Sequence, residues 1–131
     1  MDDHVGPEAT ILVVDDEERV TDLYATYLDD LYSVRRAYDG AEALDAVDAQ
    51  VDVVLLDRRM PDIAGDDVLA AIRDEGYDCK VIMLTAVDPS MDILEMNFDD
   101  YLCKPVEKTD LVSAIEQQLE VQRYDERLSE Y

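Results

Sequence analysis

The order of short apolar runs and helical patterns restricts the fold of this chain more than any other feature. The expected strands are residues 11–14, 33–38, 51–56, 81–84 and 100–103. Helical patterns are expected at 17–31, at 41–49, around 68–72 before Gly76, at 88–96 and from about 107 onward. Fully apolar runs rich in β-branched residues, such as 11–14, are typical of parallel strands buried on both faces. Five such repeats predict a parallel α/β sheet with helices on both faces.

Polar residues stand where the expected strands end. In open sheets of this kind, the functional crevice lies at the carboxyl ends of the strands, beside a switch in strand order. We therefore expect one cluster there, formed by Asp15, Asp16, Asp57, Thr85 and Lys104.

Three carboxylates crowded at one edge repel one another and need a hard cation, and a set of oxygen ligands favours Mg²⁺. A carboxylate beside Mg²⁺ and Lys104 can attack phosphorus to give an aspartyl phosphate, while the Thr85 hydroxyl donates to a phosphoryl oxygen. Simpler interpretations stay open. Asp15 or Asp16 could be a helix N-cap, Asp57 a turn residue, Thr85 an ordinary strand residue and Lys104 a surface lysine.

The composition narrows the range of partners. The 131-residue chain, expected to be one domain, carries 34 acidic and 11 basic residues, a net charge of −23. Such a surface repels phosphate backbones and anionic membranes, so direct binding of nucleic acid or membrane is not expected. Because concentrated salt screens this repulsion, the charge indicates a salty cytoplasm, with an acidic mesophilic protein as the alternative.

The sequence contains no secretory signal or membrane span, so the expected location is cytoplasmic. Cys79 and Cys103 are expected to be reduced core residues in strands.

Four segments, VVDDEE, LLDRRMPDIAG, MLTA and DDYLCKP, resemble in order the motifs of receiver domains of two-component response regulators. The resemblance implies a doubly wound (βα)5 flavodoxin-like fold with strand order 2-1-3-4-5. It also implies that Asp57 is the phosphoacceptor. Mg²⁺ would be bound directly by Asp16 and Asp57, through water by Asp15, and by the backbone carbonyl of Arg59.

The resemblance implies further roles around the phosphoacceptor. The backbone N–H groups of Arg58 and Ala86 would contact phosphoryl oxygens, and Lys104 would pair with Asp57 or its phosphate. A cis peptide bond before Pro105 would aim the lysine. Thr85 and Tyr101 would form a switch pair in which the hydroxyl moves to the phosphate and the ring turns inward, although Tyr101 could also be a plain core aromatic.

Partners and function follow from the same resemblance. A sensor histidine kinase would donate the phosphoryl group, and the altered surface would signal to a downstream protein or to a C-terminal output region. The chain would be a phosphoacceptor signalling domain rather than a turnover enzyme. The alternatives are a pseudo-receiver that only binds partners and a Mg²⁺-dependent phosphatase with an aspartate nucleophile.

Two stretches depart from the usual receiver pattern. The chain from Thr85 to Lys104 is about three residues shorter than usual and has Asn97 and Phe98 in place of Gly-Ala. This shortening predicts a short fourth helix. It leaves open how the output face is read by a partner and whether a homodimer forms in the usual way. Met91 and Met96 on that helix are expected to pack in the core. Arg58 and Arg59 could hold water or phosphate at the pocket mouth, or pair with local aspartates.

The C-terminal residues carry an apolar stripe at 3-4-3 spacing, formed by Val121, Tyr124, Leu128 and Tyr131. We therefore expect a tail at 1–9, a receiver domain at 10–120, and a helical extension or the start of another module at 121–131. With the acidic surface and the double arginine, this stripe resembles haloarchaeal response regulators that carry a HalX-type region.

Overall fold

The computed structural model describes residues 9–86 and 97–128, with side chains described as far as Tyr124. Five strands lie in these ranges: β1 (Thr10–Val14), β2 (Ser33–Ala37), β3 (Val53–Asp57), β4 (Lys80–Thr85) and β5 (Asp100–Cys103). The same ranges contain four helices: α1 (Glu18–Leu28), α2 (Gly40–Ala46), α3 (Gly65–Asp74) and α4 (Lys108–Leu128).

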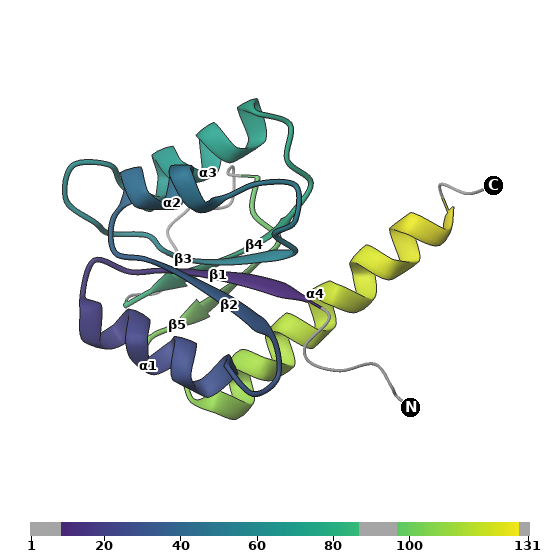
Figure 1. The fold of residues 1–131 in the computed structure, drawn as a ribbon, viewed down its shortest axis with the longest axis horizontal. Coiled ribbons are helices and arrows are strands. Elements are labelled where there is room, and N and C mark those ends of the chain that lie inside the picture. Colours follow the sequence, from purple (N-terminus) through teal and green to yellow (C-terminus); the bar gives the residue numbers. More distant parts are fainter. Residues whose placement is uncertain (1–8, 87–96, 129–131) are drawn as a thin grey trace.

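The strands form one parallel sheet in the order β2-β1-β3-β4-β5 (Figure 1). This is the predicted fold and strand order. β1 and β3 are neighbours in the middle of the sheet, and the chain runs outward from them on both sides. The carboxyl ends of these two strands therefore lie next to each other at the point where the strand order reverses, which is where ligand crevices form in such sheets.

Alternate residues of the central strands point to opposite faces and fill two separate cores. Leu12 and Val14 of β1 pack toward α2 and α3, whereas Ile11 and Val13 pack toward α1 and α4. Figure 1 shows these helix pairs on opposite faces of the sheet. All four residues are fully buried, which explains why the strand reads as a continuous apolar run.

The observed elements differ from the expected ones at a few places. α1 ends at Leu28 rather than at residue 31, and Leu31 is 43% exposed. Leu23 is also exposed, so the buried face of α1 is narrower than its apolar pattern indicates. Gly76 ends α3 as predicted, with a φ of 84° that favours glycine. The expected helix at 88–96, with Met91 and Met96, lies outside the described residues.

The two cysteines occupy different environments. Cys79 is buried and precedes β4, so its prediction as a core residue is confirmed, although it lies just outside the strand. Cys103 ends β5 and is exposed, so its prediction as a core residue was wrong, because β5 lies at the sheet edge. Both thiols are free, as expected.

Only part of the last helix, α4, packs against the sheet. Leu111, Ile115 and Leu119 bury their side chains, but Val121 and Tyr124 are exposed where the helix runs beyond the sheet (Figure 1). Within the described ranges, no helix is both long and apolar enough to cross a membrane.

Candidate functional site

Three carboxylates meet at the carboxyl ends of β1 and β3. Asp15 and Asp16 follow β1, and Asp57 is the last residue of β3. One oxygen from each of the three side chains lies within 4.8 Å of the others. Asp15 and Asp57 are buried, at 1% and 6% exposure, whereas Asp16 faces solvent. The sheet thus concentrates three acidic oxygens in a partly buried site that is open on the side of Asp16.

Lys104 reaches this cluster from the loop after β5. Its Nζ lies 2.5 Å from Oδ2 of Asp15 and 3.1 Å from Oδ1 of Asp57. The peptide bond between Lys104 and Pro105 is cis, the geometry that the resemblance implies. The lysine side chain is only 20% exposed, so it is not a solvated surface lysine.

The protonation of the site follows from burial and from these neighbours. Burial and repulsion from Asp15 raise the pKa of Asp57 from 3.8 to about 6, although Lys104 partly opposes the rise. Burial alone would lower the pKa of Lys104, but its contacts with Asp15 and Asp57 outweigh burial and raise it. Near neutral pH the lysine is therefore charged and Asp57 is mostly ionised, and a cation beside Asp57 would further favour the ionised form.

Asp15 is held by the start of α1 without capping that helix. Its Oδ1 accepts the Glu17 N–H at 3.0 Å, and its backbone carbonyl accepts the buried Thr21 hydroxyl at 2.8 Å. The N-cap residue of α1 is Glu17, which makes no side-chain cap. The alternative that Asp15 or Asp16 serves as the N-cap was therefore wrong. Thr21, which the sequence interpretation did not single out, holds the Asp15 backbone from the first turn of α1.

The expected switch residues lie on β4 and on the neighbouring edge strand β5. Thr85 ends β4, is 2% exposed, and its carbonyl accepts the Lys104 N–H at 2.7 Å. Ala86 follows it and is exposed. Tyr101 on β5 is 38% exposed and meets the ring of Phe98 edge-on, with centroids 6.3 Å apart. In this structure Tyr101 is therefore not a core aromatic.

The two arginines after Asp57 differ in their surroundings. The Arg58 guanidinium pairs with Asp66, with Nε 3.0 Å from Oδ1, whereas Arg59 is exposed. The alternative of pairing with a local aspartate is thus confirmed for Arg58. The backbone N–H of Arg58 donates to the Leu84 carbonyl at 3.0 Å. Its predicted contact with a phosphoryl oxygen would require this bond to be shared or exchanged.

Gly65 is a site residue that the sequence interpretation did not assign. A Cβ at this position would lie 2.3 Å from the Asp57 carbonyl oxygen and 2.8 Å from the Cα of Arg58. Its N–H donates to the Arg58 carbonyl at 2.9 Å. Only glycine lets α3 begin this close to the phosphoacceptor loop. The signal was present in the quoted segment LLDRRMPDIAG, whose last residue is Gly65.

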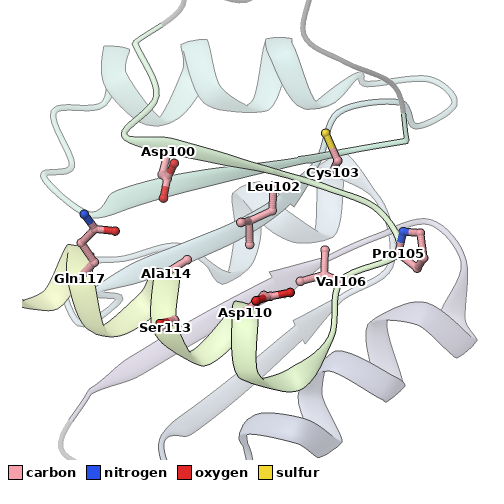
Figure 2. Close-up of a pocket in the computed structure, with 9 residues that line it drawn as sticks. All are labelled: Asp100, Leu102, Cys103, Pro105, Val106, Asp110, Ser113, Ala114 and Gln117. Carbon is pink, nitrogen blue, oxygen red and sulfur yellow. The ribbon is translucent and has the colours of Figure 1, made fainter.

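A groove of about 380 Å³ lies between β5 and α4 (Figure 2). Leu102, Val106 and Ala114 give it an apolar floor, and Asp100 and Asp110 also line it. None of the three clustered carboxylates lines this groove, so it is separate from the acidic cluster.

A five-stranded parallel sheet with clustered carboxylates and a lysine at its carboxyl edge defines the receiver class of signalling domains. The chain belongs to the response regulator receiver domain family, whose pattern matches residues 11–116. Receiver domains of this family act with histidine kinases and output domains in two-component signalling.

Individual relatives agree with this assignment. The chain is 48% identical over 125 residues to a predicted transcriptional regulator of Haloferax volcanii, covering 95% of this chain and 22% of that protein. It is 41% identical to the transcriptional regulatory protein CpxR of Escherichia coli, covering 80% of this chain and 47% of CpxR. A CheY-like receiver domain from Methanospirillum hungatei matches its fold at a TM-score of 0.82 and 28% identity, covering 89% of this chain and 98% of that structure.

The chain spans about half or less of the length of these two curated relatives. Both relatives are named as regulators of transcription. The first of them is haloarchaeal, which agrees with the halophilic interpretation of the acidic composition.

Proposed function

We propose that Asp57 accepts a phosphoryl group from a phosphohistidine of a partner kinase and that the resulting charge switches the surface of the domain. The observation that carries this proposal is the position of Asp57. Asp57 is 6% exposed, its carboxylate lies 3.1 Å from Lys104 Nζ, and it shares one site with two further carboxylates.

The donor set fits Mg²⁺, because it consists of oxygens and carries excess negative charge. Asp16 and Asp57 would hold the ion directly, Asp15 would hold it through water, and the Arg59 carbonyl would complete the set. When bound, the ion supplies positive charge that neutralises the phosphoryl oxygens. The half-open geometry supports this assignment, since exposed Asp16 leaves room for water and for the incoming group.

In the transfer, one carboxylate oxygen of Asp57 attacks phosphorus. An O–P bond forms while the bond from phosphorus to the donor imidazole nitrogen breaks, and the electron pair stays on that nitrogen. The chain contributes positioning and charge rather than further covalent chemistry. Lys104 is already within hydrogen-bond distance of Asp57 and would follow the new negative charge onto the phosphoryl oxygens. The Ala86 N–H and the Thr85 hydroxyl would donate from β4.

The switch would connect this site to β5. If Thr85 moves toward the phosphoryl group, the space that it leaves admits the ring of Tyr101. The exposed ring, held edge-on by Phe98, then corresponds to the unphosphorylated state. Phosphorylation would only bias an equilibrium between two existing arrangements.

The partners would be a sensor histidine kinase and a downstream protein or output region, with a homodimer as a further possibility. The charge of −23 argues against direct contact of this domain with nucleic acid. The domain limits of 10–120 and 121–131, the HalX-type region and the cytoplasmic location stay predictions. Self-catalysed transfer and hydrolysis, without turnover of external phosphoesters, is the activity that we propose.

The test is intact mass after incubation with acetyl phosphate in molar KCl, with and without Mg²⁺. We expect one added phosphoryl group that requires both Mg²⁺ and Asp57. Asp57→Asn should abolish the adduct. Asp62→Asn is the matched control, because Asp62 lies exposed in the same loop at a φ of 66° that asparagine also tolerates.

Two other outcomes would redirect the assignment. Absence of both the adduct and binding of beryllofluoride, a stable stand-in for the phosphoryl group, would favour a pseudo-receiver that only binds partners. Sustained release of phosphate from an external phosphoester would favour the phosphatase alternative.

A further inference from the structure

The ion pair between Arg58 and Asp66 ties the phosphoacceptor loop to the start of α3. Arg58 Nε lies 3.0 Å from Oδ1 of Asp66 and 3.4 Å from Oδ2, and Nη2 lies 3.3 Å from Oδ2. Two guanidinium nitrogens thus face both carboxylate oxygens, the arrangement that gives arginine its directional specificity. The arginine side chain is 12% exposed and that of Asp66 is 39% exposed. Such a pair restrains geometry better than a solvated one does.

Backbone contacts hold the same two segments together. The Gly65 N–H donates to the Arg58 carbonyl at 2.9 Å, and the Arg58 N–H donates to Leu84 of β4 at 3.0 Å. Residue 58 is therefore held by the sheet through its N–H, by α3 through its carbonyl, and by α3 again through its side chain. The residue directly after it, Arg59, is exposed.

We propose that Arg58 is a positioning residue whose ion pair with Asp66 holds the loop after Asp57 in the shape that receives the metal. This inference rests on the proposed function, because it concerns the same site. The guanidinium pairs with Asp66 at the start of α3. Its effect on the cluster therefore passes through the backbone of residues 57–59 rather than through direct contact with the ligand.

Geometry and simple electrostatics predict different signs for the two partners. If only charge matters, Arg58→Met removes a positive charge near the cluster and tightens Mg²⁺ binding, whereas Asp66→Asn removes a negative charge and weakens it. If the ion pair positions the loop, both substitutions weaken binding. Residues that support metal ligands from outside the coordination sphere typically change metal affinity by about 10- to 100-fold. We expect the lower end, about tenfold, because Arg58 acts through backbone.

The experiment measures Mg²⁺ dissociation constants by titration calorimetry in molar KCl for the whole chain. We expect Arg58→Met and Asp66→Asn each to weaken binding, and the double variant to be no weaker than Arg58→Met alone, since both substitutions remove the same ion pair. Arg58→Lys should not restore binding, because an ammonium cannot face both carboxylate oxygens. The matched control is the pair Arg35–Asp48, 3.0 Å apart and away from the cluster. Arg35→Met and Asp48→Asn should leave the constant unchanged.

A second readout needs no metal. Hydrogen exchange in EDTA should be faster for residues 58–64 in both Arg58→Met and Asp66→Asn, while β1 and β3 keep the protection of the parent protein. This comparison separates loss of loop geometry from loss of folding.

The outcomes distinguish the positioning role from the proposed function. Equal or tighter Mg²⁺ binding by Arg58→Met, or unchanged exchange of residues 58–64, would overturn the positioning role while phosphorylation of Asp57 stands. Failure of the parent protein to bind Mg²⁺ and to take up a phosphoryl group would overturn both.

Discussion

Replacing Asp57 by asparagine should stabilise the metal-free protein. The carboxylate is 6% exposed and sits beside Asp15, and this environment raises its pKa from 3.8 to about 6. A rise of that size corresponds to about 3 kcal/mol of free energy at a pH where the group is ionised in both folded and unfolded chains. Because Asp15 and Lys104 can rearrange around the charge, we expect a gain of about 1–3 kcal/mol in the free energy of unfolding of Asp57→Asn.

The pH dependence of this gain has a definite sign. The folded chain binds the Asp57 proton more tightly than the unfolded chain, so the contribution of this group is most favourable below about pH 4. This favourable contribution is lost as the pH rises through about 6. Above about pH 7 the contribution of Asp57 to the free energy of unfolding no longer changes with pH. Asparagine has no such titration. The two proteins should therefore differ little near pH 4, and the full difference should appear above about pH 7.

Urea unfolding followed by circular dichroism in molar KCl with EDTA measures this difference. Urea is preferred to guanidinium because it leaves the ionic strength unchanged. The control Asp62→Asn, at an exposed position, should change stability by less than about 0.5 kcal/mol. Added Mg²⁺ should narrow the difference, since binding at 100 times the dissociation constant adds about 2.7 kcal/mol to the parent protein and less to the variant that lacks a ligand.

Two results would refute this reasoning. Asp57→Asn could prove no more stable than the parent above about pH 7, which would mean that burial does not disfavour the ionised carboxylate. Alternatively, the gain could be the same near pH 4, in which case it would not come from the charge of Asp57.

Three further predictions concern Lys104, Phe98 and Gly65. Lys104→Met leaves Asp15 and Asp57 without their counter-charge. Urea unfolding in EDTA should therefore show a free energy of unfolding lower by about 3 kcal/mol, and the loss should be smaller in Mg²⁺. Phe98→Ala removes a ring contact worth about 0.5–1.5 kcal/mol. If that contact holds Tyr101 outward, the affinity for beryllofluoride measured by calorimetry should rise about 2- to 10-fold. Phe98→Leu tests whether the aromatic ring itself is needed. Gly65→Ala places a Cβ 2.3 Å from the Asp57 carbonyl oxygen and should cost about 1–3 kcal/mol by thermal unfolding, and unchanged stability would mean that α3 can shift freely.

The acidic surface sets the conditions for all these measurements. With 34 acidic and 11 basic residues, the folded chain concentrates like charge that the unfolded chain spreads out. At about 1 M salt the Debye length falls to about 3 Å, so this repulsion is screened while the partly buried cluster is screened much less. Molar KCl therefore isolates the effects of Asp57 and Lys104 from the background charge.

The sequence alone determined the fold and the position of the cluster. The runs ending at Val14, Leu56 and Leu84 are largely apolar over the length of a strand, because both faces of a central parallel strand are buried. The residues that follow such runs must lie at one edge of the sheet, since all strands run the same way. The sequence therefore predicts that Asp15, Asp57 and Lys104 lie together, as they do in the structure.

Predictions from the local sequence pattern were wrong where packing against another element determines whether a residue is buried. The apolar spacing of α1 continues to Leu31, but the helix ends at Leu28 and Leu31 stays exposed. Cys103 has the neighbours of a core strand residue, yet β5 lies at the sheet edge and leaves it exposed. Periodicity reports which residues could share a face, and not whether another element covers that face.

Only the tertiary structure decided which groups touch. Asp66 and Asp67 are adjacent and chemically alike, but Asp66 is the one that faces Arg58, because α3 begins against the loop after Asp57. Phe98 meets Tyr101 for a similar reason, since both rings lie where the chain enters β5. Contacts of this kind depend on distances of a few ångströms between separate segments. The order of residues along the chain determines the segments, and their packing determines the distances.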